Sequence, residues 1–139
     1  MGRALPTYGK LNDMAAVYYL AWIIAVVLVA VGLYALATPH GLARRYGVAA
    51  HGDDAAAFVR ATGIRDIALG VVLGAAAYLH ALVLLIVLAV MGVVVSIADF
   101  RIVSHHGRAE RHHTAHAIHA SGIVAFILVI AMALFAIGR

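Results

Sequence analysis

The chain has 139 residues, of which 65% are hydrophobic and 12% are charged, and its mean hydropathy is +1.03. A soluble domain of this size needs a polar surface that this composition cannot supply, so the sequence predicts an integral membrane protein. The absence of cysteine excludes thiol nucleophiles, disulfides and cysteine-ligated metals. The net charge of +4 is scattered over short polar segments, which favours lipid headgroups and excludes nucleic acid as the partner of the arginines.

The first apolar run, 15–37, carries no charge and is long enough to cross a bilayer. Tyr18, Tyr19 and Trp22 near its start are typical of an interfacial aromatic belt. Pro39 is expected to end this helix and to open the first polar loop.

The stretch between Asp66 and Asp99 carries no acidic or basic residue apart from His80. As one helix it would be about 48 Å long, which exceeds the bilayer core of about 30 Å; as two helices it gives about 24 Å each. A tight hairpin near Tyr78–Leu82, with both helices continuing outward past the two aspartates, satisfies both limits. We therefore expect an all-α, four-transmembrane-helix bundle forming a single domain over 1–139, with helices at 15–37, 58–79, 81–99 and 114–137.

Four helices place both termini on one side of the membrane, and the first and third loops on the other side. These two loops contain Arg44, Arg45, Arg101, Arg108 and Arg111, whereas the terminal side contains Arg3, Lys10 and Arg139. The positive-inside rule therefore predicts a multi-pass protein of the bacterial plasma (inner) membrane with the first and third loops in the cytoplasm.

Charged residues converge on the side of the membrane that holds these two loops. Arg65 and Asp66 lie at the entry of the second helix, Asp99 lies at the end of the third, and His119 lies in the first turns of the fourth. Charged groups at membrane depth cost about 2.5 to 3.5 kcal/mol on insertion scales, so they pair with one another or face the bundle interior. We expect Arg65 to pair with Asp66 or Asp99. One negative charge is then left over, and a histidinium at His119 or His116 could balance it.

The fourth helix opens with "RHHTAHAIHASG", and His112, His116 and His119 fall on one helical stripe because they follow i, i+4, i+7 spacing. Three imidazoles on one stripe could approach a metal ion, but consecutive turns of one helix rarely close a tetrahedral shell. The zinc motif H-E-x-x-H is absent. The sequence therefore predicts no metal site, with these three histidines as the candidates should one exist. It also predicts no cofactor, since a haem would need a facing histidine and His80 lies at the opposite side.

Gly70 and Gly74 form the small-xxx-small pattern "GVVLG", and Gly63 lies one heptad earlier. This pattern predicts close helix packing within the bundle, with a homo-oligomer interface as the alternative.

Four segments carry a family resemblance: "LATPHGLARRYG", "FVRATGIRDIALGVVLG", "IADFRIVSHHG" and "HAIHASGIVAF". They resemble the domain-of-unknown-function family 4267, which comprises small four-helix membrane proteins. The resemblance implies this topology and a set of family-like positions, and no activity. Where the family often has His-Gly-Gly in the last helix, Ala120 and Ser121 follow His119 here, which argues against close backbone approach at that point. The family-like positions are Gly63, Arg65, Asp66, Asp99, His106, Gly107 and His119.

Three functions fit these residues. In the first, the chain is an accessory or structural membrane bundle whose buried Arg/Asp/His cluster only fixes helix positions. In the second, it is an isomerase, cyclase or hydratase acting on a small lipophilic molecule; Asp66 or Asp99 acts with His119 as acid and base, and Arg65 stabilises negative charge. In the third, an oligomer is a proton-coupled carrier or channel.

Overall fold

The computed structural model describes residues 8–45, 53–106 and 112–138. Within these residues the chain is helical and contains no strand, which confirms the predicted all-α class. The helices are α1 (Tyr8–Ala37), α2 (Pro39–Arg45), α3 (Asp53–Tyr78), α4 (Leu82–His106) and α5 (His112–Gly138).

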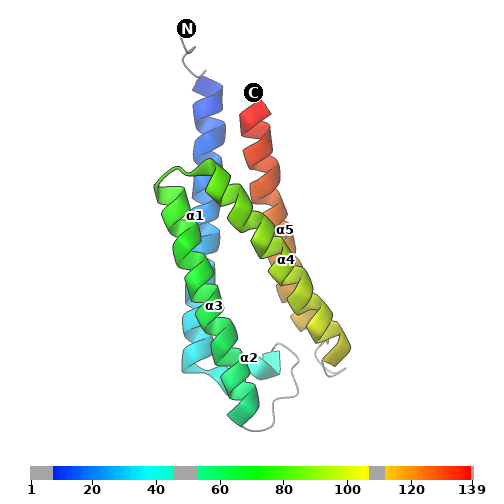
Figure 1. Cartoon of the computed structure of the whole chain (residues 1–139). Helices are drawn as coiled ribbons and strands as arrows, with labels where there is room; N and C mark the ends of the chain where they lie inside the picture. The colour runs from blue at the N-terminus through cyan, green and yellow to red at the C-terminus, as the bar shows by residue number, and fades with distance from the viewer. Residues whose placement is uncertain (1–7, 46–52, 107–111, 139) are drawn as a thin grey trace.

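The four long helices form two pairs (Figure 1). Helix α1 packs along α3, and α4 packs along α5, whereas direct contact between α3 and α4 is slight. The pairs meet where α1 begins, α5 ends and the α3–α4 turn lies, and they diverge toward the opposite end. We call these the closed end and the open end of the molecule.

Three of the long helices are apolar and long enough to cross a membrane: Asn12–Ala37 of α1, Leu82–Ile102 of α4 and His116–Gly138 of α5. The chain is therefore compatible with a multi-pass membrane protein. The predicted fourth span, α3, is not among them. The apolar sequence of α3 is interrupted by Arg60, Arg65 and Asp66, and only its second half is free of charged residues.

The turn between α3 and α4 lies inside the predicted Tyr78–Leu82 segment. His80 adopts a left-handed backbone with φ of 53°, which side-chain-bearing residues seldom do. The amide of Ala81 donates to the carbonyl of Ala76 (2.9 Å), and the amide of His80 donates to that of Ala77 (3.2 Å). These two bonds form a Schellman motif, with His80 at the position usually taken by glycine.

Glycine allows α1 and α3 to approach closely. A Cβ added to Gly32 would lie 2.5 Å from the carbonyl oxygen of Gly63, and one added to Gly70 would lie 2.8 Å from that of Ala25. The close-packing role predicted for Gly63 and Gly70 is thus realised inside the chain, between its first and third helices.

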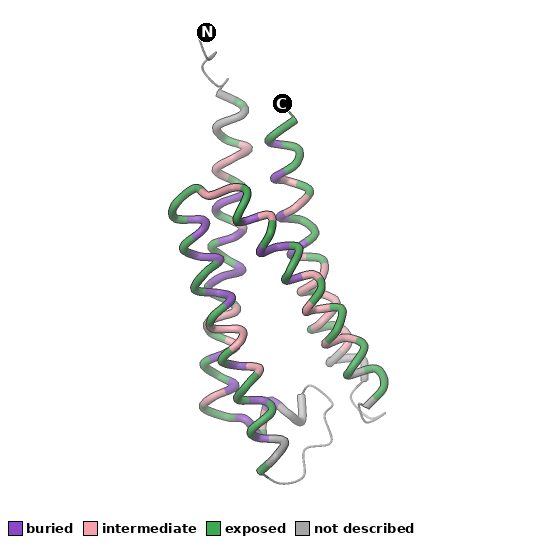
Figure 2. Tube along the Cα trace, viewed as in Figure 1, coloured by how far each residue is buried: buried purple, intermediate pink, exposed green. Residues whose placement is uncertain are grey.

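The main hydrophobic core lies toward the closed end and draws on all four long helices (Figure 2). Its fully buried side chains include Val17, Leu73, Leu85 and Val129. Apolar side chains also cover the outside of the molecule, as expected of a surface in contact with lipid. A small second core, made by Ala35, Leu42 and Val59, joins α1, α2 and α3 near the open end.

Several helix boundaries differ from the prediction. Helix α1 begins at Tyr8, seven residues before its expected start, and α3 begins at Asp53, five residues before its expected start. The segment after Pro39 was expected to be a loop, but it forms α2, because proline is well suited to the first position of a helix. Helix α4 was expected to end at Asp99 and continues to His106. No glycine or proline interrupts residues 100–106, so nothing in this segment stops the helix.

Candidate functional site

Arg65 lies on α3 and holds two carboxylates at once. Its Nη2 lies 2.9 Å from Oδ2 of Asp99 and its Nη1 lies 3.3 Å from Oδ1 of the same residue, so the contact with α4 is bidentate. The same guanidinium donates to Oδ1 of Asp66 from Nη2 (3.2 Å) and Nε (3.4 Å). Both predicted partners of Arg65 are therefore engaged together. We call Arg65, Asp66 and Asp99 the ionic clamp.

The clamp is partly exposed. The side-chain exposed fraction is 40% for Arg65, 14% for Asp66 and 22% for Asp99. No charged or polar residue in the described part of the chain is fully buried, which differs from the buried cluster expected from the sequence. The physical reason is the divergence of the two helix pairs, which leaves the clamp at the rim of an opening.

The clamp borders a half-open cavity of about 180 Å³ between the two helix pairs. His119 of α5 lines the same cavity and is close enough to Asp99 and Arg65 for their charges to act on its ring. With both carboxylates ionised, the clamp has a net charge of −1. The other polar side chains lining the cavity are Thr62, Ser96 and Ser121; apolar ones include Leu28, Leu69 and Phe126.

His116 of α5 does not join the clamp. Nε2 of His116 lies 2.9 Å from Oγ of Ser104, and its ring packs on Phe100 at a centroid distance of 4.8 Å. His116 is absent from the cavity lining. The side chains of His112 and His106 lie outside the described residues, as does Gly107. Where side chains are described, no three histidine, aspartate or glutamate groups come together as metal ligands would.

Several residues that line the cavity were not predicted from the sequence. Ser96 precedes Asp99 by three residues and Thr62 precedes Arg65 by three, so each pair shares one helical face. This three-residue spacing was the feature of the sequence that could have placed Ser96 and Thr62 beside the clamp. Gly122 was also missed: a Cβ there would lie 3.0 Å from Oγ of Ser96. Close approach of α4 and α5 is therefore provided by Gly122, one residue after the two positions where the family often has glycine.

The family described as "Domain of unknown function (DUF4267)" matches residues 25–134. No curated protein and no solved structure matches the chain. The matched region includes the whole clamp, His119 and the α3–α4 turn.

Proposed function

The chain belongs to the family named domain of unknown function 4267, and from this membership and the site geometry we propose that it is a non-enzymatic membrane protein, an accessory or structural bundle whose shape depends on the ionic clamp. One observation carries the proposal: Arg65 bridges α3 to α4 where direct packing between them is slight. The clamp is therefore the main polar link between the two helix pairs in the described part of the open end. A bundle with a fixed shape presents a fixed surface to lipids and protein partners.

The proposal includes a four-helix arrangement in the membrane. Helix α3 packs along the full apolar length of α1 and is tied to α4 by a three-residue turn. Its segment from Ile67 to Tyr78 has no charge, and its charged residues pair across the bundle or lie toward the open end. This arrangement supports insertion of α3 beside its neighbours, with the arginine-bearing loops in the cytoplasm of a bacterial inner membrane.

A charge-removal series tests the structural role. Arg65→Met alone leaves two unpaired carboxylates, and Asp99→Leu alone leaves α3 without its bridge. In the combined variant Arg65→Met, Asp66→Asn, Asp99→Leu, no charge is left without a partner. We expect each single change to lower folded yield in membranes and the combined variant to recover most of it. Arg60→Met, an exposed arginine on the same helix, is the matched control.

Equal loss in the single and combined variants would count against a purely structural clamp. It would favour a second candidate, a membrane enzyme acting on a small lipophilic molecule. That candidate is supported by one further observation: His119, Ser96 and the clamp share a half-open cavity with apolar walls. His119 and a carboxylate would act as acid and base, and Arg65 would stabilise developing negative charge.

The enzyme candidate has its own test, the lipid and metabolite profile of cells that carry the His119→Ala or Asp99→Asn chain. An unchanged profile in both, with protein levels matched to the unmodified chain, would exclude it. A third candidate, an oligomeric proton carrier, requires proton flux in liposomes that falls in His119→Ala.

A further inference from the structure

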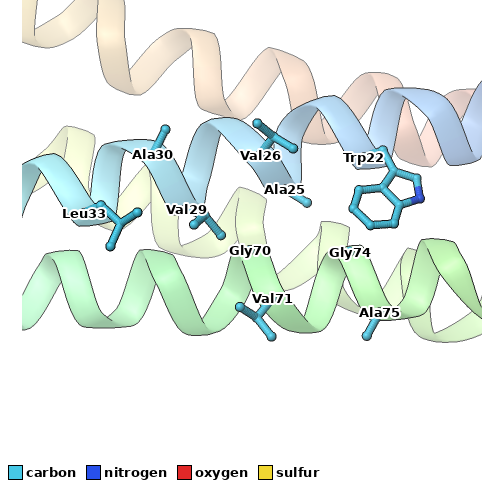
Figure 3. Close-up of a pocket in the computed structure, with 10 residues that line it drawn as sticks. All are labelled: Trp22, Ala25, Val26, Val29, Ala30, Leu33, Gly70, Val71, Gly74 and Ala75. Atoms are coloured by element: carbon cyan, nitrogen blue, oxygen red, sulfur yellow. The ribbon is translucent and has the colours of Figure 1, made fainter.

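An apolar groove of about 410 Å³ runs along one face of the α1–α3 pair (Figure 3). On α1 it extends from Trp22 to Leu33, about 16 Å at the rise of a helix. Its α3 side is lined by residues from Gly70 to Ala75. Val26, Leu33 and Val71 at the groove are each more than half exposed, so the groove opens toward the surrounding lipid. Its length and composition suit one acyl chain.

A second cavity, of about 230 Å³, continues this face toward the closed end. Its walls are mostly aromatic: Tyr18, Tyr19, Trp22, Tyr78 and His80 line it. Trp22 lines both cavities, and the α1 residues involved recur every three or four positions. The apolar groove and the aromatic chamber therefore lie on either side of Trp22, along the same face.

The chamber is built from three segments that hold one another in place. The hydroxyl of Tyr18 donates to the backbone carbonyl of His80 at 3.0 Å. The two rings meet edge to face, with centroids 4.7 Å apart and planes at 87°. These contacts fix the left-handed residue of the α3–α4 turn, so that its ring stands against the aromatic residues of α1. His80 of the chamber lies two residues before Leu82, where the α4 span begins, so this end of the chamber is expected near the lipid headgroups.

We propose that the groove and the aromatic chamber together bind one phospholipid with a quaternary ammonium headgroup. The acyl chain occupies the groove, and the trimethylammonium group lies against the faces of Tyr19, Trp22 and Tyr78. Aromatic faces attract cations, and aromatic cages are the usual recognition site for quaternary ammonium. No carboxylate lines the described chamber, so a primary ammonium would find no ionic partner there. The site shares no lining residue with the clamp cavity and does not depend on the function proposed for it.

The experiment uses the intrinsic fluorescence of Trp22, which is the chain's one tryptophan. The full chain in maltoside detergent is titrated with phosphatidylcholine, phosphatidylethanolamine and phosphatidylglycerol of identical short chains. We expect a saturable change with phosphatidylcholine and binding at least about tenfold weaker for phosphatidylglycerol, the size of effect that cation–π contacts produce. Native mass spectrometry of the same samples counts the lipids retained by each molecule.

Two pairs of variants assign the signal to the site. Tyr19→Leu and Tyr78→Leu remove side chains that are 71% exposed, so the fold should be maintained. Both should remove the preference for choline, whereas Tyr34→Leu, outside the chamber, should keep it. Ala75→Phe fills the groove and should weaken phospholipid binding without changing the binding of tetramethylammonium; Ala57→Phe, an exposed α3 position outside the groove, is its control.

Three results would overturn the proposal. The first is equal affinity for choline and glycerol headgroups, which would leave only nonspecific acyl-chain binding. The second is loss of the preference in Tyr34→Leu as large as in Tyr19→Leu. The third is tetramethylammonium binding as tightly as the phospholipid, which would make the chamber a site for a free small cation.

Discussion

The closed and open ends of this molecule are held together by different forces. At the closed end, all four long helices share a core of fully buried aliphatic side chains, and the α3–α4 turn is fastened to α1 by Tyr18. At the open end the helix pairs diverge, and one arginine with two carboxylates spans the gap. Apolar packing does not depend on charge, whereas the clamp depends on each of three charges. The contact between the helix pairs at the open end is therefore the one that a change in charge or a bound partner can break.

The largest change in the free energy of unfolding is expected from truncating a buried side chain at the closed end. Leu85 is fully buried, and Leu85→Ala should lower the free energy of unfolding by about 3 kcal/mol, because it leaves a cavity in the shared core. Leu84→Ala, at the exposed neighbouring position, should cost much less. Unfolding in mixed micelles of increasing denaturing detergent measures both. Equal costs would mean that the side chain of Leu85 does not stabilise the shared core.

The second-largest effect distinguishes Asp99, which links α4 to Arg65 of α3, from Asp66, which contacts Arg65 within α3. Asp99→Asn should lower the free energy of unfolding by about 2 kcal/mol, because the bidentate contact between α3 and α4 is lost and the clamp is only partly exposed. Asp66→Asn breaks a contact within α3 and should cost about half as much. The reverse order would show that the clamp serves α3 alone and does not hold the pairs together. The same unfolding measurement distinguishes the two outcomes.

A smaller effect concerns the α1–α3 contact. Gly32→Ala places a Cβ 2.5 Å from a backbone oxygen that cannot rotate away, and should cost about 1.5 kcal/mol. At Gly74 the nearest atom to an added Cβ is 3.5 Å away, so Gly74→Ala should be neutral or slightly stabilising. Thermal unfolding of both variants checks this difference. A cost at Gly74 that matched the cost at Gly32 would contradict it.

The smallest effect isolates the strained turn. Neither His80→Ala nor His80→Gly retains the ring that packs on Tyr18, but only glycine adopts the left-handed backbone without cost. The glycine variant should therefore be more stable than the alanine variant by about 1 kcal/mol. Thermal unfolding of the two proteins side by side measures the backbone contribution alone. Identical stabilities would show that the turn relaxes when the ring is removed.

Much of this architecture could be predicted, because hydropathy and charge carry most of the information in a membrane chain. The charge-free stretch around His80 predicted the turn, and the cost of unpaired charge predicted that Arg65 would pair with Asp66 or Asp99. The rotation of each helix about its axis could not be predicted. It directs His116 toward Ser104 and away from the cavity, and it brings Ser96 and Gly122 into the lining. These outcomes depend on packing between helices, which periodicity in one helix does not specify.

The three-residue turn at His80 has a mechanical consequence. Arg65 lies thirteen residues from the end of α3, about 20 Å along the helix axis. With the turn as a fulcrum, a rotation of only about 5° between the helix pairs would move the guanidinium by about 2 Å, enough to break a 2.9 Å contact with Asp99. Because the helices are long, a small rotation at the closed end is enough to make or break the ion pair at the open end.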